Sequence, residues 1–108
     1  MKNITIQPDI TIRQAMKTLS QTGEKCLVVI DEKNALLGTL SDGDLRKAIL
    51  KGLGIGDSIR DIYQPKPTVV VKGKYSTENA KKLFIKNKFD IIPVLDDKGR
   101  LSDILLWE

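Results

Sequence analysis

The chain repeats itself at an offset of 65 residues, and this duplication constrains its fold more than any other feature of the sequence. The matching positions are apolar or belong to turns, where packing and backbone geometry restrict the residue type. Identical pairs are Ala15/Ala80, Lys17/Lys82, Val29/Val94, Asp31/Asp96, Lys33/Lys98, Leu36/Leu101 and Leu40/Leu105. We therefore predict two copies of one unit, over residues 1–56 and 57–108.

Each copy is predicted to run strand, helix, strand, strand, helix. The apolar runs 26–30 and 91–95 are typical of central strands covered on both faces. Each is followed by a polar turn and a returning strand. Copy two is expected to begin with a short helical turn over residues 57–63 and a β-branched strand over 68–71. The predicted fold class is α/β (α+β), with a small mixed sheet and flanking helices in each copy.

The second copy stops before its closing helix. At the 65-residue offset Ser41 corresponds to Leu106, and the counterpart of Asp44 would follow Glu108. An apolar strand at the end of a chain would leave its side chains exposed. We therefore expect the sequence to be a piece of a longer polypeptide.

The composition excludes many enzyme classes. The chain has no histidine and one cysteine, Cys26, so zinc sites and histidine acid–base catalysis are excluded. Cys26 lies in an apolar run and is predicted to be a buried thiol. Asp42 and Asp44 are spaced to chelate magnesium, but no base or nucleophile accompanies them. We predict no catalytic residue and no resident metal site.

The charge pattern favours neither a nucleic acid nor a membrane as partner. The net charge is +4, and neither copy forms a basic tail. Six lysines cluster between residues 72 and 88, without the arginines or stacking aromatics of a nucleic-acid site, so a solvated helix face is the favoured interpretation. No apolar run approaches the roughly 20 residues that span a bilayer, and no signal peptide is visible. A cytoplasmic location is expected.

The stretch 37–44 passes from an apolar strand directly into an amphipathic helix. Ser41, Asp42 and Asp44 fall where the first turn of this helix has unpaired N–H groups, so they are suited to cap it. The same N–H groups also favour a bound anion. The residues alone leave two alternatives open, a plain helix cap and a ligand site.

The duplicated pattern resembles a tandem pair of CBS domains, the Bateman module. The resemblance covers nearly the whole chain. It implies two repeats packed with pseudo-two-fold symmetry. The stretches that carry it are 26–31 with 37–45 in copy one, and 91–96 with 99–101 in copy two.

The resemblance also implies a binding site for an adenosine nucleotide such as AMP, ADP or ATP. Residues 38–44 match the family's nucleotide-binding turn, which assigns Ser41 to a phosphate and Asp44 to the ribose hydroxyls. Any magnesium ion is expected to arrive with the nucleotide, and no other cofactor is implied. The remaining predicted wall residues are Thr39, Gln64, Thr68, Val69, Phe89, Ile91 and Pro93.

Two further expectations concern what surrounds the module. The chain is similar to the CBS pair that precedes a sugar-phosphate nucleotidyltransferase domain in bacterial proteins, so it would regulate that enzyme without transferase activity of its own. CBS pairs associate through their helices, which predicts a homodimer. The candidate contacts are the apolar helix faces Leu45/Ala48/Ile49 and Leu83/Phe84, which could instead cover their own sheets. The alternative function is a purely structural dimerisation module that binds no nucleotide.

Overall fold

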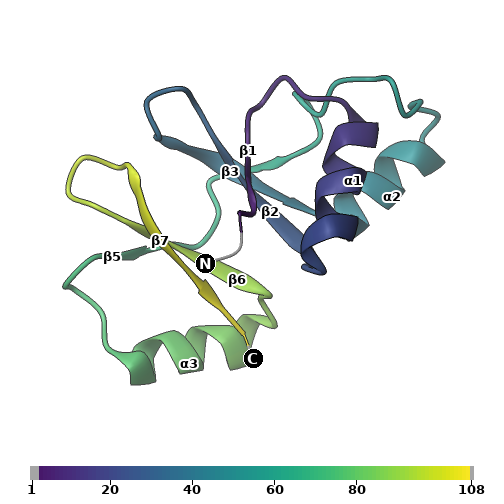
Figure 1. Cartoon of the computed structure of the whole chain (residues 1–108). Helices are drawn as coiled ribbons and strands as arrows, with labels where there is room; N and C mark the ends of the chain where they lie inside the picture. Colours follow the sequence, from purple (N-terminus) through teal and green to yellow (C-terminus); the bar gives the residue numbers. More distant parts are fainter. Residues whose placement is uncertain (1–2, 108) are drawn as a thin grey trace.

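A computed structural model describes residues 3–107, and in it each copy of the repeat forms its own β-sheet (Figure 1). Met1, Lys2 and Glu108, at the ends of the two predicted copies, lie outside the described residues. The first sheet has the order β1 (Thr5–Ile6), β2 (Cys26–Ile30), β3 (Leu36–Ser41) and β4 (Gln64–Pro65). The second has the order β5 (Val70–Val71), β6 (Ile91–Leu95) and β7 (Leu101–Leu106).

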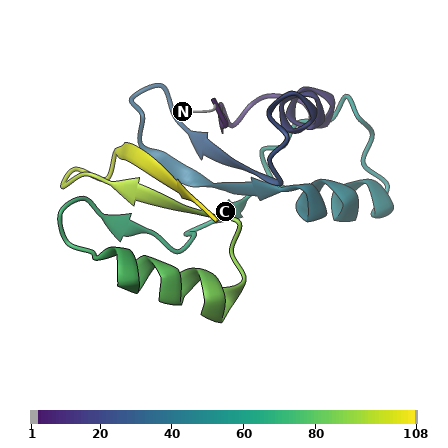
Figure 2. The ribbon, with the colours of Figure 1, turned by 60° about the horizontal axis from the view of Figure 1, so that its bottom comes forward.

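Three helices accompany the sheets, and both views place α1 and α2 at one end of the molecule and α3 at the other (Figures 1 and 2). α1 spans Ile12–Thr22, α2 spans Asp42–Leu50 and α3 spans Thr77–Asn87. Strands β1 and β2 run parallel while β2 and β3 are antiparallel, and β5, β6 and β7 repeat this arrangement. The predicted fold class, with a small mixed sheet and helices in each copy, is confirmed.

The two hairpins have the same register, which confirms the duplication. Cys26 is opposite Ser41 in the first hairpin, and Ile91 is opposite Leu106 in the second, a shift of 65 residues on both strands. Both ladders also slip at the corresponding step, after Val29 and after Val94. Identical strand pairing from few identical residues indicates that the apolar runs and the turn length determine this register.

The two copies meet about a pseudo-two-fold axis. Ala35 and Arg100 occupy equivalent positions, and they pair with each other in an isolated antiparallel bridge. Two backbone hydrogen bonds flank the bridge, from Leu36 N to the Gly99 carbonyl and from Leu101 N to the Asn34 carbonyl. Exchanging the copies converts one of these bonds into the other, as the expected symmetry requires.

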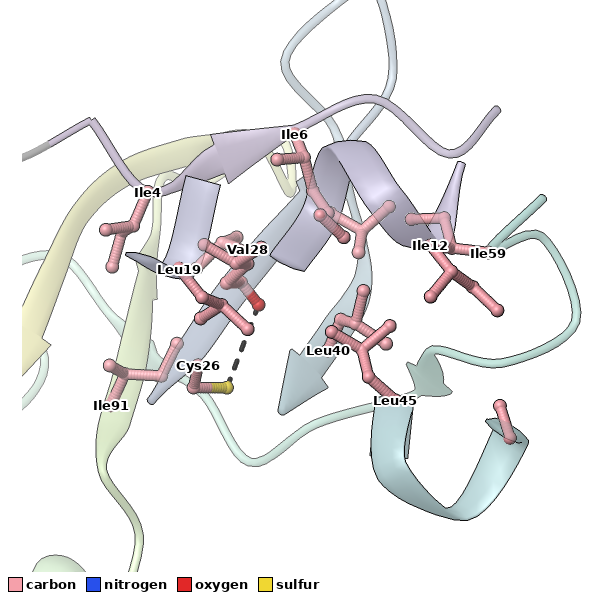
Figure 3. Packing of buried hydrophobic residues seen from close by; sticks show 14 of the residues in the cluster. Ile4, Ile6, Ile12, Leu19, Cys26, Val28, Leu40, Leu45, Ile59 and Ile91 are labelled. Atoms are coloured by element: carbon pink, nitrogen blue, oxygen red, sulfur yellow. Dashed lines mark hydrogen bonds between the residues drawn. The ribbon is translucent and has the colours of Figure 1, made fainter. Parts of the chain in front are cut away.

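The main hydrophobic core contains side chains from both copies. It is built on β2, β3, α1 and α2, and it also includes Ile91 and Ile104 from the second copy. Figure 3 shows Ile91 near Cys26, with Ile4 on the same side of the cluster. The second cluster is small, with four buried residues, Val70, Phe84, Ile92 and Val94. Copy two therefore depends on copy one for much of its apolar burial.

Residues 57–71 differ in part from the prediction. The short helical turn expected over 57–63 is a single hydrogen-bonded turn, in which Ile62 N donates to the Ile59 carbonyl. This segment runs beside residues 10–12, with Ile59 N donating to the Ile10 carbonyl and Ile12 N to the Asp57 carbonyl. The strand expected over 68–71 is reduced to β5. Strand β4 was not predicted, because Pro65 lacks the N–H group that a central strand needs. The side chain of Ile59 is fully buried in the first core and explains why this segment follows copy one.

The longest described helices, α1 and α3, have 11 residues each. Within residues 3–107, no helix has the length and apolar character needed to cross a bilayer.

Candidate functional site

The predicted motif lies where β3 runs into α2 without a connecting loop. Ser41 is the N-cap of α2, and its Oγ accepts a hydrogen bond from Asp44 N at 3.0 Å. In return, Asp44 Oδ2 accepts a hydrogen bond from Ser41 N at 2.9 Å. This reciprocal capping box satisfies two N–H groups that the helix would otherwise leave unpaired. The predicted capping role is confirmed.

The other carboxylate oxygen of Asp44 faces residues 57–69, the first part of copy two, which leads from the first sheet to the second and is called the linker from here on. Gln64 Nε2 donates a hydrogen bond to Asp44 Oδ1 at 3.2 Å, and Gln64 is held nearby because β4 pairs with β3 at Thr39. A carboxylate accepts up to about four hydrogen bonds, so Asp44 retains acceptor capacity beyond these two contacts. Asp44 therefore both caps the helix and presents an acceptor to the space beside it.

That space is a cleft of about 410 Å³ whose walls come from both copies and from the linker. It brings together seven of the predicted wall residues from sites up to 52 positions apart, and Val69 and Pro93 are not among its lining residues. Pro93 is buried within β6, opposite Ile104 of β7. The predicted residues that do line the cleft are Thr39, Ser41, Asp44, Gln64, Thr68, Phe89 and Ile91.

Several cleft residues were not predicted as part of the site. Cys26 enters because it is opposite Ser41 in the hairpin. Lys88 could have been found by the repeat, since it occupies the position of Gly23 and precedes the predicted Phe89. The other additions are Pro65, Lys66 and Pro67.

The thiol of Cys26 is neutral in this environment. Burial raises its pKa to about 12, and the carboxylates of Asp90 and Asp44 add to the increase because they disfavour a nearby thiolate. Its Sγ makes a weak contact with the Leu27 carbonyl at 3.8 Å (Figure 3). Cys26 is therefore part of the wall and not a nucleophile at neutral pH.

A second cavity, of about 450 Å³, extends along α2 and shares Asp44 and Gln64 with the cleft. Its other charged lining residues are Lys47, Lys51 and Asp61. Among the described residues, none beyond Gln64 lines this cavity, whereas residues 88–91 also line the cleft. A ligand in the cleft thus contacts both copies at once, and we take the cleft as the candidate site.

The cleft offers groups that bind rather than groups that break bonds. It combines a carboxylate acceptor, the hydroxyl of Ser41 at a helix N-terminus, two lysines and the apolar surfaces of Phe89 and Ile91. Among residues 3–107 there is no cluster of three or more histidine, cysteine or acidic side chains arranged to hold a metal ion.

Known proteins share this sequence and architecture. Arabinose 5-phosphate isomerase GutQ of Salmonella typhi is 29% identical over 92 residues, which cover 85% of this chain and 28% of that protein. CBSX2 of Arabidopsis thaliana in complex with AMP is 31% identical with a TM-score of 0.80, over 94% of this chain and 79% of that chain. The cytosolic domain of the Mg²⁺ channel MgtE in complex with ATP has the same fold, with 24% identity and a TM-score of 0.79 over 97% and 42% of the respective chains.

The family model described as CBS domain matches residues 1–51 and 59–106, the two copies of the repeat. This chain therefore belongs to the CBS domain family, as a tandem pair.

Proposed function

We propose that this CBS pair is a non-catalytic regulatory module that binds an adenosine nucleotide in the cleft between its copies. One observation carries the proposal: Ser41 and Asp44, at the start of α2, line a cavity that is also lined by the segment 88–91 of copy two. CBSX2, which is 31% identical, is described in complex with AMP. That complex supports the proposal because the two chains align over most of their lengths.

The contacts follow from the donors and acceptors in the cleft. Asp44 Oδ1 accepts hydrogen bonds from the two ribose hydroxyls, taking the place of the Gln64 amide. The Ser41 Oγ accepts from Asp44 N, so its own hydrogen is available to donate to a phosphate oxygen. The partial positive charge at the start of α2 favours that phosphate. Phe89 and Ile91 supply apolar surface for the base.

Regulation would result from the ligand's contact with both copies. A nucleotide shifts an equilibrium between two packings only to the extent that it binds one packing more tightly. The chain spans 28% of GutQ, an isomerase. The identity of the domain that this module would regulate is therefore a second proposal. The resemblance in the sequence predicts a nucleotidyltransferase, and reading the gene beyond residue 108 tests that prediction.

Calorimetry with AMP, ADP, ATP and the corresponding cytidine and guanosine nucleotides tests the site. We expect Asp44→Ala to weaken binding of adenosine nucleotides at least about tenfold, because a hydrogen bond to a charged group contributes about 1.5–3 kcal/mol. Asp42→Ala is the matched control, since Asp42 is on the same helix turn but pairs with Arg46 and does not line the cleft. Absence of binding at millimolar nucleotide, or undiminished binding to the Asp44 variant, would contradict the proposal.

The alternative function, a dimerisation module without a ligand, is favoured by apolar side chains left exposed around the end of α2. Leu50 is 79% exposed and Ile55 is 51% exposed. Of the helix residues expected to form the dimer contact, Leu45, Ala48 and Phe84 are buried within their own copy. Light scattering separates the two functions: a dimer whose melting temperature does not respond to nucleotide supports the structural role alone.

A further inference from the structure

Two lysines line the cleft from separate segments. Lys66 belongs to the linker, between Pro65 and Pro67, and Lys88 follows the end of α3 in copy two. The remaining charged lining residues are Asp44 and Asp90. The cleft thus contains two positive side chains that come from the linker and from copy two, whereas Ser41 and Asp44 come from copy one.

Both lysines have an unusual backbone conformation. Among the described residues, only three non-glycine residues have positive φ: Asn34 at 67°, Lys66 at 56° and Lys88 at 55°. Asparagine adopts this left-handed conformation readily, but lysine pays a steric penalty. Copy one has Gly23, with φ of 72°, at the position that corresponds to Lys88. Backbone geometry therefore favours glycine at these positions, and it does not explain a lysine at either of them.

Neither lysine forms an ion pair with another residue of the described range 3–107. The ion pairs among the described residues are Arg46 with Asp42 and Arg100 with Asp96, so Lys66 and Lys88 have no carboxylate partner in that part of the chain. The two acids of the cleft are close enough to Cys26 to disfavour its thiolate. Lys66 and Lys88 are therefore the positively charged residues of the cleft, beside two carboxylates that act on Cys26.

We propose that Lys66 and Lys88 select the phosphate chain of the ligand, so that the cleft prefers a nucleoside di- or triphosphate to a monophosphate. This inference rests on the nucleotide binding proposed above. The hydroxyl of Ser41 and the N-terminus of α2 are sufficient to bind a single phosphate. Each further phosphate adds negative charge that the two unpaired lysines neutralise.

Calorimetry in EDTA with adenosine, AMP, ADP and ATP tests this proposal on the wild type, Lys66→Gln, Lys88→Gln and the double variant. We expect each single change to weaken ATP binding about fivefold, the upper range for an exposed charge pair, and to change AMP binding less than twofold. The preference for ATP over AMP should also decrease with added salt. Lys86→Gln is the matched control, because Lys86 is exposed on α3 and does not line the cleft.

Lys88→Gly separates ligand recognition from backbone strain. Glycine relieves the left-handed conformation, so this variant should melt at a higher temperature and still lose ATP preference as Lys88→Gln does. An ATP preference that survives in the double variant overturns the proposal, as does equal binding of AMP and ATP by the wild type. If AMP binding still depends on Asp44 in those cases, the proposed function stands. If no nucleotide binds, both fail.

Discussion

Asp44 shows how one side chain serves both the fold and the proposed site. Its Oδ2 closes the capping box with Ser41, and its Oδ1 accepts from Gln64 of the linker. Because the first contact is local in sequence, it holds the carboxylate in place whether or not a ligand is bound. The second contact joins residues 20 positions apart and is the one that a ribose would replace.

Cys26 gives a test of the cleft's electrostatics. With its pKa raised to about 12, the native thiol should react with iodoacetamide far more slowly at pH 8 than the thiol of the urea-unfolded chain, whose pKa is near 9. The unfolded state loses the thiol proton first, so this group lowers the stability of the fold as pH rises from about 9 to 12. Mass spectrometry of the intact chain measures the alkylation rate.

Asp90→Asn is the informative variant for this test. It removes the nearby carboxylate, the second cause of the raised Cys26 pKa, so the alkylation rate in mildly alkaline solution should rise. The rate should stay below that of the unfolded chain, because burial is the largest cause and remains. Equal rates for native and unfolded wild-type protein at pH 8 would show that the thiol is not buried.

At the scale of elements, the close approach of β3 to β4 positions the linker wall of the cleft. Gly38 of β3 pairs with Pro65 of β4. A Cβ at Gly38 would overlap the Gln64 carbonyl oxygen and lie 2.7 Å from Tyr63 Cδ1. The absence of a side chain at this position therefore lets the linker pack against the sheet and brings Gln64 to Asp44.

Gly38→Ala should consequently destabilise the protein by about 1–3 kcal/mol, the usual range for overpacking, and weaken nucleotide binding by displacing β4. Gly43→Ala is the opposite case, because an added Cβ there meets only Ser41 Oγ at 3.7 Å and Gly43 lies within α2. Alanine should stabilise the helix by about 0.5–1 kcal/mol. Urea denaturation measures both changes, and a Gly38 variant as stable as the wild type would show that β4 is loosely held.

At the scale of the whole molecule, the symmetry of the backbone is not matched by the packing. The hairpins share one register, but the main core has fifteen buried residues and the second has four. Ile91 and Ile104 of copy two complete the main core. Copy two therefore gains much of its stability at the interface between copies, which is also where the cleft lies.

This dependence predicts that the two copies unfold together. Trp107 is the only tryptophan of the chain and packs against Phe84, with ring centroids 5.3 Å apart, so its fluorescence reports on copy two. Its urea transition should coincide with that of far-ultraviolet circular dichroism, which reports on all helices and strands. Nucleotide at 100 times its dissociation constant should stabilise both signals equally, by about 2.7 kcal/mol. Loss of the fluorescence signal at lower urea would show that copy two unfolds independently.

The sequence by itself determined the local features. The duplication is visible in matching residue types along the chain, while the hairpins and the placement of Ser41 and Asp44 at a helix start depend on residues near one another in the sequence. Apolar periodicity and capping chemistry are enough to predict such features. The wider wall of the predicted site came from the family resemblance, and five of its residues line the same cleft as Ser41 and Asp44: Thr39, Gln64, Thr68, Phe89 and Ile91.

Only the tertiary structure decided how the linker and the copies come together. Strand β4 contains a proline and is stabilised by pairing with β3, so no local pattern reveals it. The bridge between Ala35 and Arg100 joins residues 65 positions apart, and the contact of Lys66 and Lys88 with one cavity depends on the packing of separate segments. Contacts between distant residues form together when the whole core is buried. No local sequence pattern therefore identifies any one of these contacts.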